Sequence, residues 1–221
     1  VGVNRALRSA SWYECRPEPD LTQWLDLVAL GTVCDVVPLT GLNRALVMQG
    51  LKVMAARDNT GLRALSDVAG LKEKPGTYHA GFLLGPRINA GGRIGESDLG
   101  SRLLSTDDIG EATDIAHRLD ELNRERRGIE AAVLDAAMDE AKKTGDDLSP
   151  LILVAEEGWH PGVIGIVASR VMREFYRPTF ILASDGDGWK GSARSIEGFD
   201  LAEAMRGCDD LLNDHGGHAM A

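Results

Sequence analysis

Three things are scarce in this sequence: cysteine, long apolar runs and positive charge. The cysteines, Cys15, Cys34 and Cys208, are far apart and fit no zinc-binding pattern, which favours a reducing cytoplasm over a disulfide framework. No run approaches the roughly 20 apolar residues of a membrane span, so we expect no membrane partner. The net charge of −10 argues against wrapping of nucleic acid by a basic surface, although it leaves room for a local basic groove.

A signal peptide and an initiating methionine are missing as well. The chain begins at Val1 and stops at Ala221, shortly after a Gly-Gly-His triplet. We therefore expect both ends to be cuts in a longer protein. What is present is a length of 221 residues, of which 43% are hydrophobic, and this suffices for one large domain or two small ones.

The residue pattern predicts one long, exposed helix over 107–143 that joins two domains. Its apolar residues recur every three or four positions, as on one face of a helix. Ser105 and Asp108 have the spacing of a capping box at its start, and Gly145 follows its end. The sequence is helical and loop-rich before this helix, whereas strand and helix patterns alternate after it.

Before the long helix, the pattern predicts a helical region with one functional loop. Helices are expected over 21–34, 43–56, 61–68, 77–84 and 100–104. The first is expected to be buried because apolar residues such as Trp24 and Val28 cluster in it, and the fourth to end at Gly85-Pro86. Residues 87–95 are too glycine-rich for a helix and too polar for a core strand, so we expect a loop there.

After the long helix, the pattern predicts a small mixed sheet. Strands are expected over 151–155, 179–183 and 190–195, and helices over 163–175 and 201–212. This β-α-β-β-α order predicts helices packed on the sheet and places the chain in the α/β class.

Asp35 is the first residue that could carry chemistry. It ends a helix, stands among apolar residues and precedes a backbone that Pro38 constrains, so its carboxylate is held in place. A positioned carboxylate could ligate a metal ion, or it could simply cap a local turn. One aspartate does not make a metal site, and the sequence reveals no second cluster of ligands.

The expected loop over 87–95 is the second candidate. Arg87 and Arg93, with Asn89 between them, could bind phosphate oxygens while the glycines allow close approach of the backbone. Glycine-rich segments are also common turns, and this one matches neither a P-loop nor a dinucleotide-binding fingerprint.

His160 and a Ser-Ala-Arg segment are the next candidates. His160 precedes the helix expected from Val163, whose free N–H groups suit an anion, yet a lone histidine is more often structural. Ser192 and Arg194 alternate on one face of a strand, where they could hold a phosphate or simply face solvent.

The last candidate is the terminal histidine pair. His215 and His218 have a spacing that could bind a metal ion. Gly216 and Gly217 between them favour a different use, in which the backbone closely approaches a ligand.

Taken together, five segments give the chain a strong resemblance to a known family. They are ALGTVCDVVPL, GPRINAGGRIG, GWHPGVIGIVASR, KGSARS followed by GFDL, and the terminal GGHAMA. In this order they resemble the bacterial RecJ family of the DHH phosphoesterase superfamily, over residues 21–221. The resemblance implies the C-terminal part of a DHH catalytic domain at 1–105, a long connecting helix at 106–145, and a DHH-associated substrate-binding domain, truncated at its end, at 146–221.

The resemblance also implies a function. RecJ-type enzymes hydrolyse single-stranded DNA from 5′ to 3′ in DNA repair and recombination, using two Mn²⁺ or Mg²⁺ ions. The implied partners are single-stranded DNA with a 5′ end, a single-strand-binding protein and a RecQ-type helicase.

Several candidate residues match positions of the family. Asp35 matches the aspartate that ligates metal, and Arg87 and Arg93 lie in the loop that lines the DNA path. Ser192 and Arg194 match positions similar to those that hold the 5′ phosphate. The resemblance thus implies a basic channel in an acidic protein.

The remaining matches and the departures lie near the end of the chain. Gly216, Gly217 and His218 match the GGH motif that faces the substrate across the cleft, and His160 is a further phosphate-binding candidate. The chain contains no Asp-His-His, the motif that names the superfamily, and it lacks the oligonucleotide-binding domain that follows GGH. We therefore expect the intact protein to be a nuclease and the 221-residue chain alone to be inactive.

Three other functions remain open. The first is a DHH-family phosphodiesterase that acts on short oligonucleotides or cyclic dinucleotides, although the glycine-rich loop and the long helix favour RecJ. The second is a non-catalytic nucleic-acid-binding module, like the related domain of alanyl-tRNA synthetases, which would not need the Asp35 region. The third is a structural or interaction domain that docks through its long helix.

Overall fold

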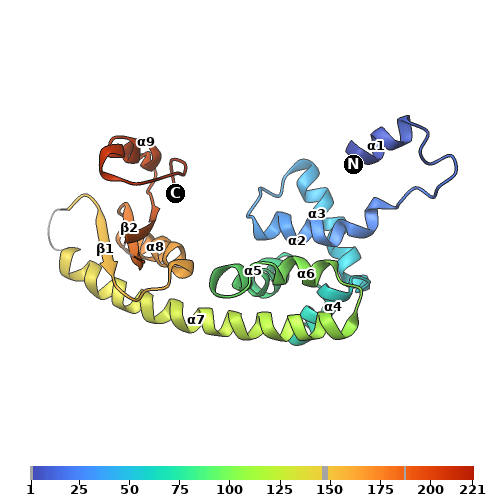
Figure 1. Ribbon diagram of the computed structural model, residues 1–221, viewed down its shortest axis with the longest axis horizontal. Helices are drawn as coiled ribbons and strands as arrows, with labels where there is room; N and C mark the ends of the chain where they lie inside the picture. Colours follow the sequence, from blue (N-terminus) through green and yellow to red (C-terminus); the bar gives the residue numbers. More distant parts are fainter. Residues whose placement is uncertain (1, 146–148, 187) are drawn as a thin grey trace. The chain divides into compact units, whose positions relative to one another are not determined.

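The computed structural model describes residues 2–145, 149–186 and 188–221, which form two compact units (Figure 1). Unit 1 comprises Val1–Gly91 and Ser97–Asp120, and unit 2 comprises Gly92–Glu96 and Glu121–Ala221. The long helix α7 (Ile109–Gly145) contributes its first turns to unit 1 and the rest to unit 2. The α/β class and the long helix are therefore confirmed.

Unit 1 is helical. Its elements, besides the start of α7, are α1 (Gly2–Ser9), the 3-10 helix η1 (Leu21–Trp24), α2 (Leu25–Cys34), α3 (Gly41–Ala56), α4 (Thr60–Val68), the π-helix η2 (His79–Leu84), most of α5 (Gly85–Ile94), and α6 (Leu99–Ser105). Helix α2 packs against α3 and η2, and α4 packs against α6. Leu65, Leu84 and Leu103 are fully buried in this core.

Helix α2 is only partly buried, which corrects the prediction for 21–34. Ala29 and Leu30 enter the core, but Val28 is 39% exposed, and Trp24, the last residue of η1, is 47% exposed. An apolar sequence therefore does not place the whole helix inside, because α3 and η2 cover only part of its surface.

The segment over 85–94 is a helix, which corrects the loop predicted over 87–95 except at Gly95, and the preceding helix does not end at Gly85-Pro86. Gly85 has helical backbone angles and donates its N–H to Ala80 O, so η2 continues directly into α5. Pro86 lies at the junction of η2 and α5 and has no N–H to donate, so this helical run continues although it lacks one backbone hydrogen bond. Tertiary contacts outweigh the weak helix propensity: Ala90 is fully buried, and Arg87 pairs with Asp120.

The cap of α7 also differs from the prediction. Ser105 is the last residue of α6, and its hydroxyl donates to Ser101 O. Asp108 caps α7, since its Oδ1 accepts the Glu111 N–H at 2.8 Å. The Glu111 carboxylate accepts in turn from the Thr106 hydroxyl at 2.7 Å.

Unit 2 contains a three-stranded mixed sheet and confirms the predicted β-α-β-β-α order. Its elements after α7 are β1 (Ile152–Glu156), α8 (Pro161–Phe175), β2 (Thr179–Asp185), β3 (Gly188–Arg194), α9 (Leu201–Arg206) and the 3-10 helix η3 (Asp209–Leu211). The strand order is β1-β2-β3, with β1 parallel and β3 antiparallel to β2. The last helix is shorter than the predicted 201–212: α9 ends at Arg206.

One face of the sheet lies in a core shared with α7 and α8. Val154 of β1 and Ile181 of β2 are neighbours on this face, and they pack with buried residues such as Val167 of α8 and Ala137 of α7. On β3 the residue paired with Ile181 is Ser192. The inner face therefore changes from apolar to polar at β3.

No helix in the described part of the chain combines the length with the apolar character that a membrane span requires.

Candidate functional site

Asp35 lies at the end of α2 in unit 1. Its N–H donates to Gly31 O at 3.0 Å, which fixes its backbone, and its side chain is exposed. The neighbouring Cys34 thiol is directed to Ala80 O at 3.5 Å, so the end of α2 lies beside η2. Within residues 2–145, 149–186 and 188–221, no three His, Cys, Asp or Glu side chains gather closely enough to hold a metal ion. Asp35 can supply one carboxylate ligand, but these residues do not provide a complete metal centre.

Arg87 and Asn89 lie on α5, also in unit 1. The Arg87 guanidinium is held by two partners: Nε donates to Asp120 Oδ1 at 2.9 Å and Nη1 to Leu83 O at 2.7 Å. Both side chains of the ion pair are largely buried, whereas Asn89 is exposed. A phosphate contact by Arg87 would therefore rely on Nη2 and the second N–H of Nη1, with much of its charge already balanced by Asp120.

Arg93 lies at the end of α5 and belongs to unit 2. Its side chain is exposed, and its Nη1 donates to Gly162 O at 3.1 Å. The bond ties the guanidinium to the first turn of α8 and leaves its other N–H groups available for an anion.

His160 caps the start of α8. Its ring Nδ1 accepts the Gly162 N–H at 3.0 Å, and the Val163 N–H donates to His160 O at 3.1 Å. These two N–H groups are therefore used within the chain, and Pro161 has none, so an anion at this helix end would need side-chain donors. Because Nδ1 accepts, the neutral ring carries its proton on Nε2.

Ser192 and Arg194 lie side by side on β3, as their alternation predicts. Arg194 Nη1 donates to Ser192 Oγ at 3.2 Å and to Ala193 O at 2.6 Å. Arg194 Nε donates to Ser169 Oγ of α8 at 3.1 Å. Ser169 was not among the candidates from the sequence, because it lies 25 residues before its partner Arg194.

The terminal Gly-Gly-His segment is held beside the end of β3. The Ser195 N–H donates to Met220 O at 3.0 Å, and the Leu201 N–H donates to Ala219 O at 2.9 Å. His218 itself is exposed and forms a tight turn with Ala221, whose N–H donates to His218 O at 3.0 Å. These bonds place the segment containing Gly216 and Gly217 in the same region as Arg194.

His215 has its own partner. Its Nε2 pairs with the Asp209 carboxylate, an exposed acceptor six residues earlier. A metal ion bound by His215 and His218 would have to displace this pair, so the geometry favours a structural role for His215.

A buried ionic cluster links α7 and α8, and sequence reasoning did not find it. Glu130, which is 5% exposed, accepts from both Arg126 and Arg170, and Arg126 Nη2 donates to Asn123 Oδ1 at 3.1 Å. Burial lowers the pKa of the Arg126 guanidinium, and the positive charge of Arg93 adds to this effect, while Glu130 opposes it. The spacing of Arg126 and Glu130, four apart on a helix, was the available signal.

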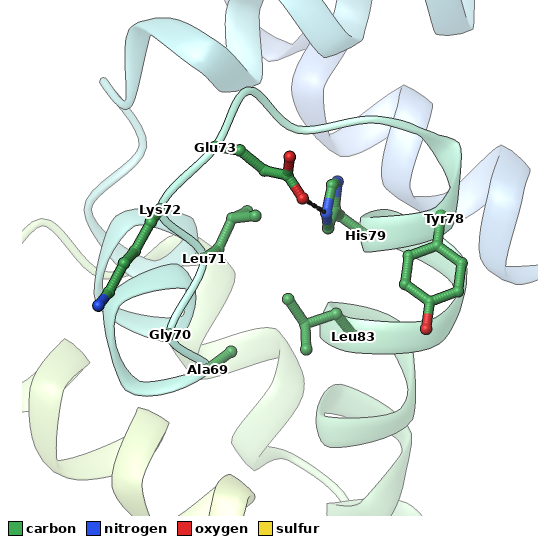
Figure 2. Close-up of a pocket in the computed structure, with 8 residues that line it drawn as sticks. All are labelled: Ala69, Gly70, Leu71, Lys72, Glu73, Tyr78, His79 and Leu83. Atoms are coloured by element: carbon green, nitrogen blue, oxygen red, sulfur yellow. Dashed lines mark hydrogen bonds and ion pairs between the residues drawn. The ribbon is translucent and has the colours of Figure 1, made fainter.

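Unit 1 also has a cavity of about 470 Å³ that contains none of the predicted site residues (Figure 2). Leu71 and Leu83 contribute apolar surface, and His79 pairs with Glu73 at 3.0 Å across one side. Tyr78 lies at the edge of this cavity (Figure 2). We assign it no function.

Comparison with known proteins gives these features a context. Residues 148–221 match the family described as the DHHA1 domain. The whole chain is 41% identical over 233 aligned residues to the single-stranded-DNA-specific exonuclease RecJ of Escherichia coli. Crystal structures of RecJ from Thermus thermophilus, one with Mn²⁺ and one with Mg²⁺, each match with a TM-score of 0.83 and 38% identity over 94% of this chain.

The coverage of these relatives is partial. The chain spans 40% of the length of the Escherichia coli protein, and 31% and 32% of the two Thermus thermophilus chains.

Proposed function

Since this chain is RecJ-like over its whole length and carries a DHHA1 domain, we propose that it is part of an exonuclease that degrades single-stranded DNA from 5′ to 3′. The longer protein then hydrolyses phosphodiester bonds and acts in DNA repair and recombination. A single-strand-binding protein and a RecQ-type helicase are its proposed partners, and the cytoplasm its proposed location.

The arrangement of Ser192 and Arg194 is the observation that carries this proposal. A 5′ phosphate is a compact dianion, and a guanidinium held in a fixed orientation can donate to two of its oxygens. Arg194 is held in this way by bonds from Nε and Nη1, which leaves Nη2 as the remaining nitrogen of the fork. A neighbouring serine hydroxyl can donate to a further phosphate oxygen.

The other residues of unit 2 have supporting roles in this proposal. Arg93 contributes a further guanidinium, which is exposed, for the DNA backbone. Gly216, Gly217 and His218, held beside the end of β3, contact the substrate through backbone and imidazole. His160 acts mainly by capping α8, so its contribution to phosphate binding is indirect.

In unit 1, Asp35 is the proposed metal ligand, and Arg87 and Asn89 are proposed to contact the DNA backbone. The Mn²⁺ and Mg²⁺ in the relatives' structures support the use of divalent cations by the longer protein. Such ions activate a water molecule and stabilise the leaving oxygen when bound. This chain offers them one proposed carboxylate, so we expect the 221 residues alone to be inactive.

The test is degradation of 5′-phosphorylated single-stranded DNA by the longer protein in Mn²⁺, with and without Asp35→Asn. We expect the substitution to abolish degradation, while Asp58→Asn, an exposed aspartate of the same unit, leaves it unchanged. Degradation that survives Asp35→Asn would remove Asp35 from the metal site. Cleavage of dinucleotides without degradation of long strands would instead favour a phosphodiesterase of short oligonucleotides.

A further inference from the structure

The face of α8 that meets β3 is built from small residues. Gly165 and Ser169 are four positions apart, so both lie on one side of the helix. They face the two polar residues of β3, Ser192 and Arg194, whereas the neighbouring part of α8 buries Val163, Val167 and Val171 in the apolar core. The helix thus provides a polar recess where a larger apolar residue would complete the core.

Ser169 fixes the orientation of the Arg194 guanidinium. The Ser169 hydroxyl donates to Gly165 O at 3.1 Å, so its lone pairs are left to accept, and Arg194 Nε donates to it at 3.1 Å. Ser192 Oγ accepts from Nη1 at 3.2 Å on the other side of the guanidinium. An arginine held from both helix and strand loses less side-chain freedom when it binds an anion.

Gly165 leaves the space in which this geometry forms. A Cβ atom on Gly165 would lie 3.0 Å from Ser192 Oγ and 3.3 Å from Arg194 Nη2. Both distances are too short for an ordinary contact, so the serine or the guanidinium would have to move by a few tenths of an ångström. Nη2 is the nitrogen that the bonds to Ser169 and Ser192 do not use.

We propose that Ser169 is a positioning residue that aims Arg194 at the 5′ phosphate of single-stranded DNA, and that Gly165 keeps Arg194 Nη2 and Ser192 Oγ in place to receive it. This inference rests on the proposed function, because it assumes that Arg194 reads the phosphate. It adds two residues of α8 that do not touch the DNA but set how well the terminal phosphate is recognised.

The test measures binding of the 221-residue chain to one oligonucleotide sequence that carries either a 5′ phosphate or a 5′ hydroxyl, by fluorescence anisotropy. We expect Ser169→Ala to reduce the preference for the phosphorylated strand roughly tenfold, the fold-change that accompanies loss of a hydrogen bond to a charged group. Ser169→Thr, which keeps the hydroxyl, restores most of the preference. Gly165→Ala reduces it, whereas Gly128→Ala, with open space around it, does not.

A spectroscopic readout separates positioning from folding. The NMR signal of the Arg194 Nε–H group reports the bond to Ser169 without any DNA, and we expect Ser169→Ala to shift or broaden it. Arg173→Ala removes an exposed positive charge from the same helix and serves as the control for charge alone. Circular dichroism checks that every variant folds.

The outcomes distinguish the two proposals. A wild-type chain without preference for the 5′ phosphate overturns phosphate recognition and hence the use proposed for Ser169. A preference that Arg194→Ala abolishes but Ser169→Ala leaves intact overturns the positioning role only. A Ser169→Ala variant that weakens binding to both strands equally also overturns it, since a merely structural defect would do so.

Discussion

The main-chain oxygen of Arg93 lies so close to Gly162 that a Cβ atom on the glycine would come within 2.1 Å of it. The arginine side chain returns to the same residue, because its Nη1 donates to Gly162 O at 3.1 Å. The end of α5 is thus held against the first turn of α8 by both backbone and side chain, and only glycine allows this approach.

Gly162→Ala is therefore expected to destabilise unit 2. The methyl group meets backbone that cannot rotate away, and overpacking of this kind costs about 1–3 kcal/mol. Urea denaturation followed by circular dichroism measures the change in the free energy of unfolding. Gly128→Ala is the control: it has open space in the middle of α7 and should stabilise the chain by up to about 1 kcal/mol. Equal stability of the Gly162→Ala variant and the wild type would contradict the close approach.

Glu130→Gln is expected to destabilise unit 2 more strongly. Glu130 is the negative charge between Arg126 and Arg170, and Arg126 Nε already has no hydrogen-bond partner within the described residues. Removing one partner of a buried ion pair leaves the other charge uncompensated, at a cost of roughly 3 kcal/mol or more. Urea denaturation again measures the effect.

The control for that prediction is Glu140→Gln on the same helix. Glu140 pairs with Lys143 at 2.9 Å, but both side chains are exposed. Pairs of this kind contribute less than about 1 kcal/mol. Similar losses for the two variants would show that the buried cluster contributes no more than a surface pair.

His160→Ala and His160→Asn together test whether His160 is only a helix cap. The cap is the bond from the Gly162 N–H to Nδ1, so alanine should cost about 1 kcal/mol of stability. Asparagine supplies an equivalent acceptor and should restore the stability. Thermal denaturation gives the comparison, and binding of 5′-phosphorylated DNA by the asparagine variant shows whether the imidazole has a second role. Loss of binding without loss of stability would give His160 a direct contact with the ligand.

The architecture of unit 2 could be predicted because each element has a clear local pattern. The apolar run that became β1 is typical of a buried strand, and the periodic residues of α8 are typical of an amphipathic helix. Together with the patterns of the elements that follow, they predict the β-α-β-β-α order. Alternation along β3 also predicts that Ser192 and Arg194 share one face.

What could not be predicted depends on contacts between distant residues. The glycine-rich α5 is helical because Ala90 is buried and Arg87 pairs with Asp120 of α7, 33 residues later. The helix propensity of the local sequence takes neither contact into account. For the same reason, Ser169 could not be matched with Arg194 before the helix was placed against the strand. The roles of Asp35 and of the other candidates toward metal and DNA stay predictions.

The pH dependence of stability in unit 1 is expected to reflect Asp26. Burial raises the pKa of this carboxyl group, which is 3% exposed, while the Leu27 N–H that it accepts opposes the shift. The folded state therefore holds the proton more tightly than the unfolded state. Stability should fall as the pH rises from about 3.9, the ordinary value, through the raised pKa, and then remain at the lower level.

Asp26→Asn removes this titration while keeping the size of the side chain. Urea denaturation of both proteins from about pH 4 to about pH 7 should show the wild type losing stability relative to the variant. Asp58→Asn should weaken the trend, because the negative charge of Asp58 contributes to the raised pKa of Asp26. A constant difference in stability across the range would contradict the assignment.

Cys34 is expected to be the slowest of the three cysteines to react. Burial raises the pKa of its thiol, and the negative charge of Asp35 adds to this effect, whereas Cys15 and Cys208 are exposed. Only the thiolate is nucleophilic, so iodoacetamide at about pH 8 should label Cys15 and Cys208 first, as peptide mass spectrometry can follow. Asp35→Asn should speed the labelling of Cys34 only in part, because burial, the larger cause, remains. If the variant instead labels Cys34 as fast as the exposed cysteines, the end of α2 is not packed against η2 as the bond to Ala80 O requires.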